Sequence, residues 1–232
     1  MKKALELKRK YLSERDKLFQ TLISTNDGVH FNKNHTNLVD NIVKELVEEI
    51  LEIHPVSDFT LIAVGGYGRR DLSPKSDVDL LFIYKKTNKN IRDFITTLNN
   101  SLWDIGLEVG ISFLTIKQAT IDSKKDIKTV TKFVETRYLI GDEDYYGEFV
   151  RSIKILVGKI NPLKICEQKL LELVDRHDFY LGIKSNLEPQ IKEGIGGLRD
   201  IHTIIWISIF IFNVHKLDEL SQICLLYTSP SP

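Results

Sequence analysis

Two aspartates, Asp77 and Asp79, stand one residue apart at the start of an apolar segment, VDLLFIY (78–84). Side chains alternate between the two faces of a β-strand, so these two point the same way, with Cα atoms roughly 6–7 Å apart. Carboxylates placed like this repel each other unless a cation lies between them. Oxygen ligands at a solvent-exposed strand end are typical of Mg²⁺, which shares one or two carboxylates with substrate phosphates. The spacing therefore predicts a divalent-metal site for phosphoryl chemistry, with Mg²⁺ expected and Mn²⁺ as the alternative.

A pair of glycines, Gly65 and Gly66, follows a second apolar segment, FTLIAV (59–64). Glycine N–H groups approach a polyphosphate closely because no side chain intervenes. The other candidate nucleotide-binding residues nearby are Arg69, Arg70 and Ser76. A guanidinium group suits a phosphate oxygen because it offers several donors in a fixed fork. Two glycines after a strand are often only a turn, and an Asp-x-Asp pair is often a solvated strand end. Their combination, about ten residues apart, favours nucleotide binding.

The composition describes a globular protein without a bulk charge. Of the 232 residues, 42% are apolar and 28% charged, and Lys+Arg and Asp+Glu both number 32. This neutrality favours neither nucleic acid nor a membrane as a partner. Cys166 and Cys224 have no ligand-like spacing and are expected to be reduced thiols. The N-terminus has no signal-peptide pattern, and the run IIWISIFIF (204–212) is too short to cross a bilayer. We therefore expect a cytoplasmic protein.

The spacing of apolar residues predicts mixed secondary structure in three successive regions. Residues 1–54 form an N-terminal helical arm, residues 55–125 a core, and residues 126–224 a helical region. Predicted helices cover 4–22, 37–53, 91–105, 127–140, 145–157 and 163–182, and predicted strands cover 59–64, 78–84 and 107–114. Strands mixed with helices favour an α/β or α+β core. Residues 225–232 have turn composition and are interpreted as a truncation scar or non-native tail.

The order of a strand, two glycines, a short helix and an Asp-x-Asp strand resembles the polymerase-β-like nucleotidyltransferase superfamily. Four stretches also resemble successive blocks of the bifunctional PII uridylyltransferase/uridylyl-removing enzyme family. They are GGYGRRDLSPKSDVDLL (65–81), LWDIGLEVG (102–110), ETRYLIGD (135–142) and NLEPQIKEGIGGLRDIHTIIWI (186–207). The resemblance implies an α+β fold, with a small mixed sheet and helices as the nucleotidyltransferase core. The N-terminal arm and a C-terminal helical domain for substrate or partner would flank that core.

The same resemblance implies a reaction in nitrogen regulation. A tyrosine of the PII signalling protein would attack the α-phosphorus of UTP and release pyrophosphate. Asp77 and Asp79 would be catalytic metal ligands, and Gly65 and Gly66 would hold the triphosphate. Glu108 matches a third carboxylate of the superfamily, which takes the hydroxyl proton or completes the metal shell. The alternative for Glu108 is an exposed strand glutamate.

The glycine-rich stretch KEGIGGLRD (192–200) also has two interpretations. The resemblance implies that Lys192 and Arg199 contact the nucleotide or PII. The alternative is a loop that precedes a buried helix, with Asp200 near its first turn. His177 and Asp178 form a single His-Asp pair, which we interpret as a surface helix face because further metal ligands are missing around it.

The chain departs from the family pattern at two positions and in its length. Ile111 stands where the family has histidine, and Leu114 where it has a basic residue. The chain is too short for the HD and ACT domains of the family, so hydrolysis and glutamine sensing are not expected. Two alternatives remain open: a related signalling nucleotidyltransferase with another nucleotide or acceptor, or a truncated nucleotide- or PII-binding module without turnover. A nucleic-acid polymerase is disfavoured by the neutral charge.

Overall fold

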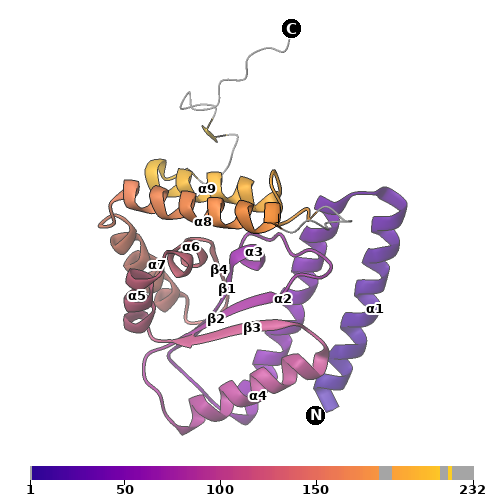
Figure 1. Cartoon of the computed structure of the whole chain (residues 1–232). Coiled ribbons are helices and arrows are strands. Elements are labelled where there is room, and N and C mark those ends of the chain that lie inside the picture. Colours follow the sequence, from indigo (N-terminus) through magenta and orange to yellow (C-terminus); the bar gives the residue numbers. More distant parts are fainter. Residues whose placement is uncertain (1, 183–189, 215–218, 221–232) are drawn as a thin grey trace. The chain divides into compact units, whose positions relative to one another are not determined.

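The computed structural model describes residues 2–182, 190–214 and 219–220 (Figure 1). The chain divides into two compact units, Met1–Lys154 and Ile155–Pro232. The strands are β1 (Phe59–Val64), β2 (Val78–Tyr84), β3 (Val109–Leu114) and β4 (Thr136–Gly141). The helices are α1 (Lys2–Thr25), α2 (Gly28–Ile53), α3 (Gly65–Gly68), α4 (Lys89–Ile105), α5 (Ile116–Lys125), α6 (Ile127–Val134), α7 (Glu143–Val157), α8 (Pro162–Gly182) and α9 (Leu198–Phe212). The tail predicted at 225–232 lies outside the described residues.

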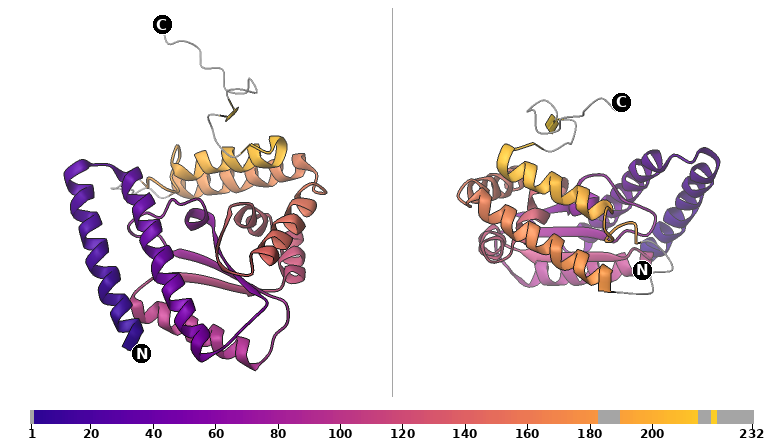
Figure 2. Two further views of the ribbon diagram at one scale, coloured as in Figure 1. Left: turned by 180° about the vertical axis from the view of Figure 1, so that it is seen from behind. Right: turned by 45° about the horizontal axis from the view of Figure 1, so that its top comes forward.

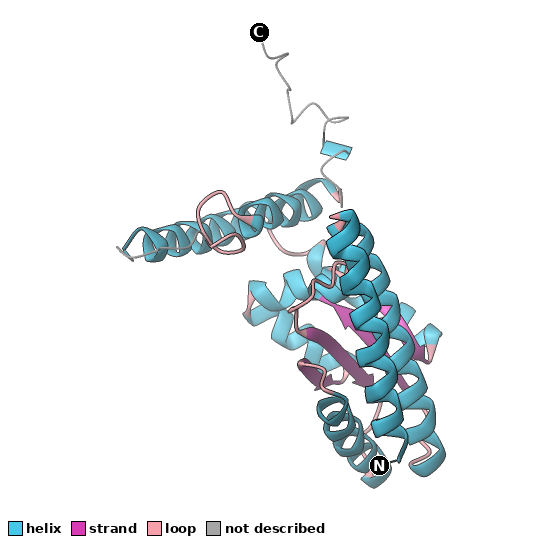
Figure 3. Ribbon diagram, turned by 90° about the vertical axis from the view of Figure 1, so that its right-hand side faces the viewer, coloured by secondary structure: helices cyan, strands magenta, loops and turns pink. Residues whose placement is uncertain are grey.

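A four-stranded mixed sheet forms the centre of the first unit, in the order β3-β2-β1-β4. β1 is antiparallel to both β2 and β4, whereas β2 is parallel to β3. The expected α+β class with a small mixed sheet is therefore confirmed. Figure 3 shows the strands lying between helices.

The prediction of one helix over 127–140 was wrong, because the chain forms α6 and then strand β4. The segment TRYLIG combines a β-branched and an aromatic residue with an aliphatic pair, a composition that favours strands. Its backbone also completes the hydrogen bonds of β1, whose other edge is already paired with β2. The helical spacing of apolar residues holds for α6 alone. In the residues that follow, pairing with β1 determines the secondary structure.

The two central strands have apolar residues on both faces. Leu61 and Ala63 of β1 and Leu80 and Phe82 of β2 join one hydrophobic core with α1, α2 and α4. The alternate residues, such as Ile62 and Leu81, are also buried but belong to the opposite face. Asp79 lies on that opposite face, since Val78 and Leu80 both point into the core with α2 and α4. The helices α2 and α4 therefore fix the strand while leaving the carboxylate outside their core.

The two N-terminal helices pack side by side as an antiparallel pair, coloured indigo to purple in Figure 2. A buried polar residue, His35 on α2, joins them to the loop that precedes β2. Its Nδ1 lies 3.1 Å from the carbonyl oxygen of Leu72, and its Nε2 lies 3.2 Å from the hydroxyl of Tyr11. The residue as a whole is 3% exposed. Nδ1–H therefore donates to the carbonyl, and Nε2 accepts from the hydroxyl, which is the neutral tautomer.

We predict that stability falls below about pH 6.5 because of His35. Burial lowers the pKa of His35, the nearby Arg15 lowers it further, and the bond to the Leu72 carbonyl partly opposes the shift. A histidine whose folded pKa is lowered takes up its proton more readily when the chain unfolds. The free energy of unfolding should thus be constant above the unfolded pKa and decline toward the folded pKa, by at most about 1.4 kcal/mol per pH unit.

Urea unfolding at several pH values between 5 and 8 measures this slope. His35→Asn keeps an N–H donor for Leu72 and removes the titration, so its unfolding free energy should depend less on pH than that of the wild type. Equal slopes for the two proteins would rule out His35 as the cause.

The second unit contains α8 and α9, which pack side by side along their lengths (Figure 2). α8 confirms the helix predicted at 163–182, and α9 begins at Leu198, directly after the glycine-rich loop. Gly197 is its N-cap, and Asn213 ends it in the left-handed conformation. Among the described residues, none of the helices combines the length and the apolar character that a bilayer span requires.

Candidate active site

Three carboxylates line one open pocket of about 340 Å³ in the first unit. They are Asp77, Asp79 and Glu108, and the remaining lining residues are Trp103, Val109 and Gly110. Asp77 and Glu108 are exposed, and the side chain of Asp79 is 39% exposed. The structure thus brings the three predicted catalytic carboxylates to one place, although their roles stay predictions.

Parallel pairing of β2 with β3 explains why Glu108 lies beside the two aspartates. The register sets Val78 opposite Val109 and Asp79 opposite Gly110, and the N–H of Val78 donates to the carbonyl oxygen of Glu108 at 2.7 Å. β3 begins one residue after Glu108, so the prediction that this residue lies within the strand was wrong. Because Glu108 lies outside the strand, strand alternation does not determine the direction of its side chain, which lines the pocket.

Glycine at position 110 leaves room for the Asp79 carboxylate. A Cβ atom added there would lie 3.0 Å from Oδ1 of Asp79, closer than side chains normally pack. The carboxylate would have to shift by a few tenths of an ångström to accept it. The stretch LEVG (107–110) therefore contributes two features to the pocket: the Glu108 carboxylate, and the space at Gly110 that the Asp79 carboxylate requires.

The glycine turn after β1 passes close to the same carboxylate. Gly65 has φ +60°, a left-handed conformation that favours glycine, and a Cβ added to it would lie 3.6 Å from Oδ2 of Asp79. Gly68 ends α3 against the backbone of the chain before β4, where an added Cβ would lie 2.3 Å from the carbonyl oxygen of Glu135. The absence of a side chain at Gly68 thus lets the turn pack against the Glu135 backbone, and Gly65 lies beside the Asp79 side chain.

A buried ion pair between Arg137 and Asp40 is hydrogen-bonded to the backbone of the glycine turn. Arg137 of β4 donates to both carboxylate oxygens of Asp40 on α2, at 2.7 and 3.0 Å. It also donates to the carbonyl oxygen of Tyr67 within α3, at 3.2 Å, and lies 5.3 Å from the centre of the Tyr67 ring. One guanidinium therefore connects α2, β4 and the glycine turn.

The predicted nucleotide-binding residues near the turn have protein contacts of their own. Arg69 donates to Oε2 of Glu135 at 2.5 Å, and the Glu135 side chain is only 5% exposed. Arg70 is exposed and donates to Oδ1 of Asn37 at 3.0 Å. Ser76 is exposed in the loop before Asp77. Arg69 is therefore part of the framework of the turn, whereas Arg70 and Ser76 face solvent.

A lysine that the sequence did not indicate reaches the pocket side chains. Nζ of Lys132, on α6, lies 2.9 Å from Oδ1 of Asp79. The two residues are 53 positions apart, and no local pattern links them. Only the path of the chain after β3, through α5 and α6, places this cation at the carboxylate.

The carboxylate oxygens of Asp77 and Asp79 suit a divalent ion that takes its remaining ligands from water and substrate. Among the residues that the structure describes, no group of three or more His, Cys, Asp or Glu side chains is arranged so that it could hold a metal ion. Two aspartates at an open pocket instead match an ion such as Mg²⁺, which binds one or two carboxylates together with waters and phosphate oxygens.

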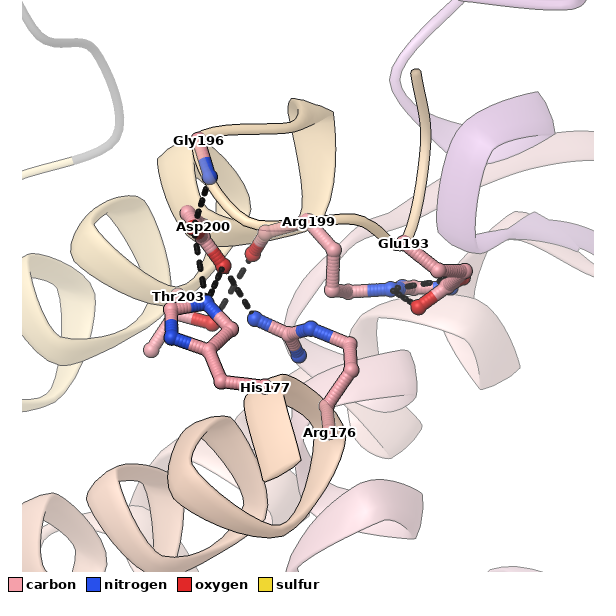
Figure 4. A network of polar contacts seen from close by, with 7 residues as sticks. All are labelled: Arg176, His177, Glu193, Gly196, Arg199, Asp200 and Thr203. Atoms are coloured by element: carbon pink, nitrogen blue, oxygen red, sulfur yellow. Dashed lines mark hydrogen bonds and ion pairs between the residues drawn. The ribbon is translucent and has the colours of Figure 1, made fainter. Parts of the chain in front are cut away.

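The glycine-rich loop of the second unit is bonded within that unit, as Figure 4 shows. Arg199 donates to Glu193 at 3.0 Å and lies 5.6 Å from the centre of the Trp206 ring. Lys192 is exposed, and its carbonyl oxygen accepts from the N–H of Arg199. Lys192 and Arg199 thus both have contacts within the second unit. Their predicted role in anion binding stays a prediction.

Asp200 is the centre of a polar network at the start of α9 (Figure 4). It accepts from Arg176, from the N–H of Gly196 at 2.8 Å and from Nε2 of His177 at 3.0 Å. Burial would raise the pKa of Asp200, but the Gly196, His177 and Arg176 donors outweigh it and lower that pKa. Asp178 is exposed, as expected for a surface helix face, whereas the side chain of His177 is only 22% exposed and is bonded to Asp200.

The two departures from the family pattern lie in the sheet. Ile111 is paired with Leu80, and Leu114 with Ile83, in the ladder between β3 and β2. Ile111 is partly buried and packs against the hydrophobic core. Neither residue lines the pocket described above.

Comparison with known proteins matches both parts of the chain. Residues 43–143 match the nucleotidyltransferase domain family, and residues 164–229 match the GlnD PII-uridylyltransferase family. A bifunctional uridylyltransferase/uridylyl-removing enzyme of Rhodospirillum rubrum is 34% identical over 95% of this chain and 23% of its own length. Proteins of the same name are 33% identical in Nitrosospira multiformis, over 87% of this chain, and 41% in Chromobacterium violaceum, over 64%. The matches span 23% and 17% of those two relatives.

Proposed function

Since the chain belongs to the GlnD PII-uridylyltransferase family, we propose that it transfers UMP from UTP to a tyrosine of a PII protein. The nucleotidyltransferase match covers the three pocket carboxylates and the glycine turn. We further propose that the sheet is a polymerase-β-like core, with α1 and α2 as its N-terminal arm. The sequence predicted residues 55–125 as the catalytic core and residues 126–224 as a helical substrate or partner domain. Because β4 pairs with β1 in the same sheet, we propose that the core extends through β4 and that the helical domain follows it.

The observation that carries the proposal is the gathering of Asp77, Asp79 and Glu108 around one open pocket, beside the Gly65 turn. A nucleotidyl transfer needs negatively charged ligands for a metal ion and a backbone that accommodates phosphates. The pocket lies at the start of β2, so Asp79 is fixed by a strand whose other face is packed in the core, and Asp77 and Glu108 directly precede β2 and β3.

Asp77 and Asp79 would hold the divalent ion, for which we propose Mg²⁺. When bound, that ion neutralises charge on the phosphates and so favours displacement at phosphorus. Gly65 and Gly66 would allow the triphosphate to approach the backbone, and Arg70 and Ser76 would add donors from the exposed side. Lys192 and Arg199 of the second unit are proposed as further anion contacts.

In the transfer step, the tyrosine oxygen of PII forms a bond to the α-phosphorus. The bond from that phosphorus to the bridging oxygen breaks, and pyrophosphate leaves with the electron pair. Glu108 would accept the phenolic proton, because it is an exposed carboxylate in the pocket with the two aspartates. No oxidant or other co-reactant is required.

The test is incubation of the chain with Mg²⁺, a PII protein and each of the four α-³²P-labelled nucleoside triphosphates in turn. We expect label on PII from UTP alone, together with release of pyrophosphate. Label from another nucleotide would identify a related nucleotidyltransferase instead. If none of the nucleotides labels PII and pyrophosphate is not released, the chain is a binding module, and the proposed activity is wrong.

A further inference from the structure

We propose that Lys132 alternates between two anions: the Asp79 carboxylate in the nucleotide-free protein and the phosphates of the bound nucleotide. The inference rests on the proposed function, because it takes Asp79 as a metal ligand. It assigns to α6 a role in nucleotide binding that depends on a residue outside the sequence motifs.

Lys132 reaches the carboxylate of Asp79 from α6. Its ammonium group lies 2.9 Å from Oδ1 of Asp79, and the two side chains are 32% and 39% exposed. The neighbours Thr131 and Phe133 are buried, which fixes this turn of α6 while the lysine side chain reaches toward the pocket. The helix is also held at its end, where Glu135 bonds Arg69.

A divalent ion and Lys132 would compete for the same carboxylate. An ammonium group and a divalent cation on the same carboxylate repel each other, so a metal at Asp79 displaces Lys132 from Oδ1. A lysine side chain has a flexible four-carbon stem and moves without a change in the helix. The anions that arrive with the metal are the phosphates of the nucleotide. Lys132 is thus within reach of a new partner in the same event that removes its old one.

The experiment uses the whole chain and two binding measurements that do not depend on turnover. Free Mn²⁺ is measured by electron paramagnetic resonance to obtain the affinity for metal alone. The nucleotide affinity is measured by isothermal titration calorimetry in the presence of Mg²⁺. The ligand is a UTP analogue with an imido group between the α- and β-phosphorus, where the proposed reaction would break the bond. Lys132→Met keeps most of the stem length and removes the charge.

Lys132→Met should have opposite effects on the two affinities. Mn²⁺ alone should bind about two- to fivefold more tightly, since a competing cation of a partly exposed ion pair is gone. The nucleotide analogue should bind about 10- to 100-fold more weakly, because a charged hydrogen bond is lost. Lys132→Arg keeps the charge and should restore much of the nucleotide affinity.

Lys128→Met is the matched control, because it removes the same charge from an exposed position one turn earlier on α6. It should leave both affinities unchanged. A lysine that only holds Asp79 in place would make both affinities weaker in Lys132→Met, and this result would overturn the inference, as would no change in either. Metal binding that is absent from the wild type, or unaffected by Asp79→Asn, would reject the proposed metal site itself and the inference with it.

Discussion

Asp79→Asn should reduce UMP transfer to PII by roughly a thousandfold while leaving the fold intact. The substitution keeps the size of the side chain and removes the charge that a metal ligand needs. Metal ions typically contribute several kcal/mol to stabilising a phosphoryl transition state. A loss of about 4 kcal/mol corresponds to the stated factor in rate. Transfer is measured as the initial rate of labelling of PII with saturating UTP and Mg²⁺.

The structure also limits the effect of this substitution on stability. Asp79 is 39% exposed, and its ion pair with Lys132 is open to solvent. Pairs of this kind contribute about 0.2–1 kcal/mol. A thermal unfolding curve close to that of the wild type, together with lost activity, would assign the effect to chemistry.

Asp104→Asn provides the matched control. Asp104 is an exposed carboxylate near the end of α4, next to Trp103 in the sequence, and it is not among the pocket residues. This variant carries the same change in charge and should keep its transfer rate. An Asp79→Asn enzyme with more than a tenth of the wild-type rate would reject Asp79 as a metal ligand in the reaction.

Arg137→Met should lower the free energy of unfolding of the first unit by about 3–5 kcal/mol. Its partner Asp40 is 9% exposed at the side chain, and Arg137 is 17% exposed. Removal of one partner leaves a buried charge without compensation, which is the costly change in a buried ion pair. The carbonyl oxygen of Tyr67 loses a donor in the same substitution.

The two tryptophans allow the first unit to be followed separately. Trp103 lies in the first unit and Trp206 in the second. In a Trp206→Phe background, the fluorescence of Trp103 during urea unfolding reports on the first unit. The midpoint and slope of that transition give the free energy of unfolding.

The double variant Asp40→Leu with Arg137→Met tests the physical reason. It removes both charges, so it should be more stable than Arg137→Met alone. A single variant destabilised by less than about 1 kcal/mol, or a double variant less stable than the single, would show that the unpaired buried charge is not the cause. Asp40→Asn should fall between the wild type and Arg137→Met, because the amide keeps a hydrogen-bond acceptor.

Local periodicity in the sequence was sufficient for most of the first unit. The helical stripe of α2 and the apolar runs of β1 and β2 predicted these elements, because each repeats at the period of its own backbone. The alternation in β2 also put Asp79 on the face opposite Val78 and Leu80, and Asp77, which precedes the strand, lines the same pocket. Glu108 was expected nearby from the resemblance, and the parallel register of β3 accounts for its position.

The contacts between distant parts of the sequence were decided only by the tertiary structure. β4 formed where the sequence suggested a helix, since the free edge of β1 could be paired there. Arg69 was predicted to bind phosphate because its guanidinium fork suits phosphate oxygens, and that role stays a prediction; only the fold shows that the same group donates to Glu135.

The sequence by itself thus determined which strand carries Asp79 and that Asp77 stands directly before it, and both side chains line the pocket. The tertiary structure decided which cations meet the acidic groups: Lys132 at Asp79, from 53 residues away, and Arg137 at Asp40, from 97 residues away. The physical reason is that a strand or helix pattern is set by neighbours along the chain. An ion pair requires only opposite charges at close distance, and the fold alone fixes which charges come together.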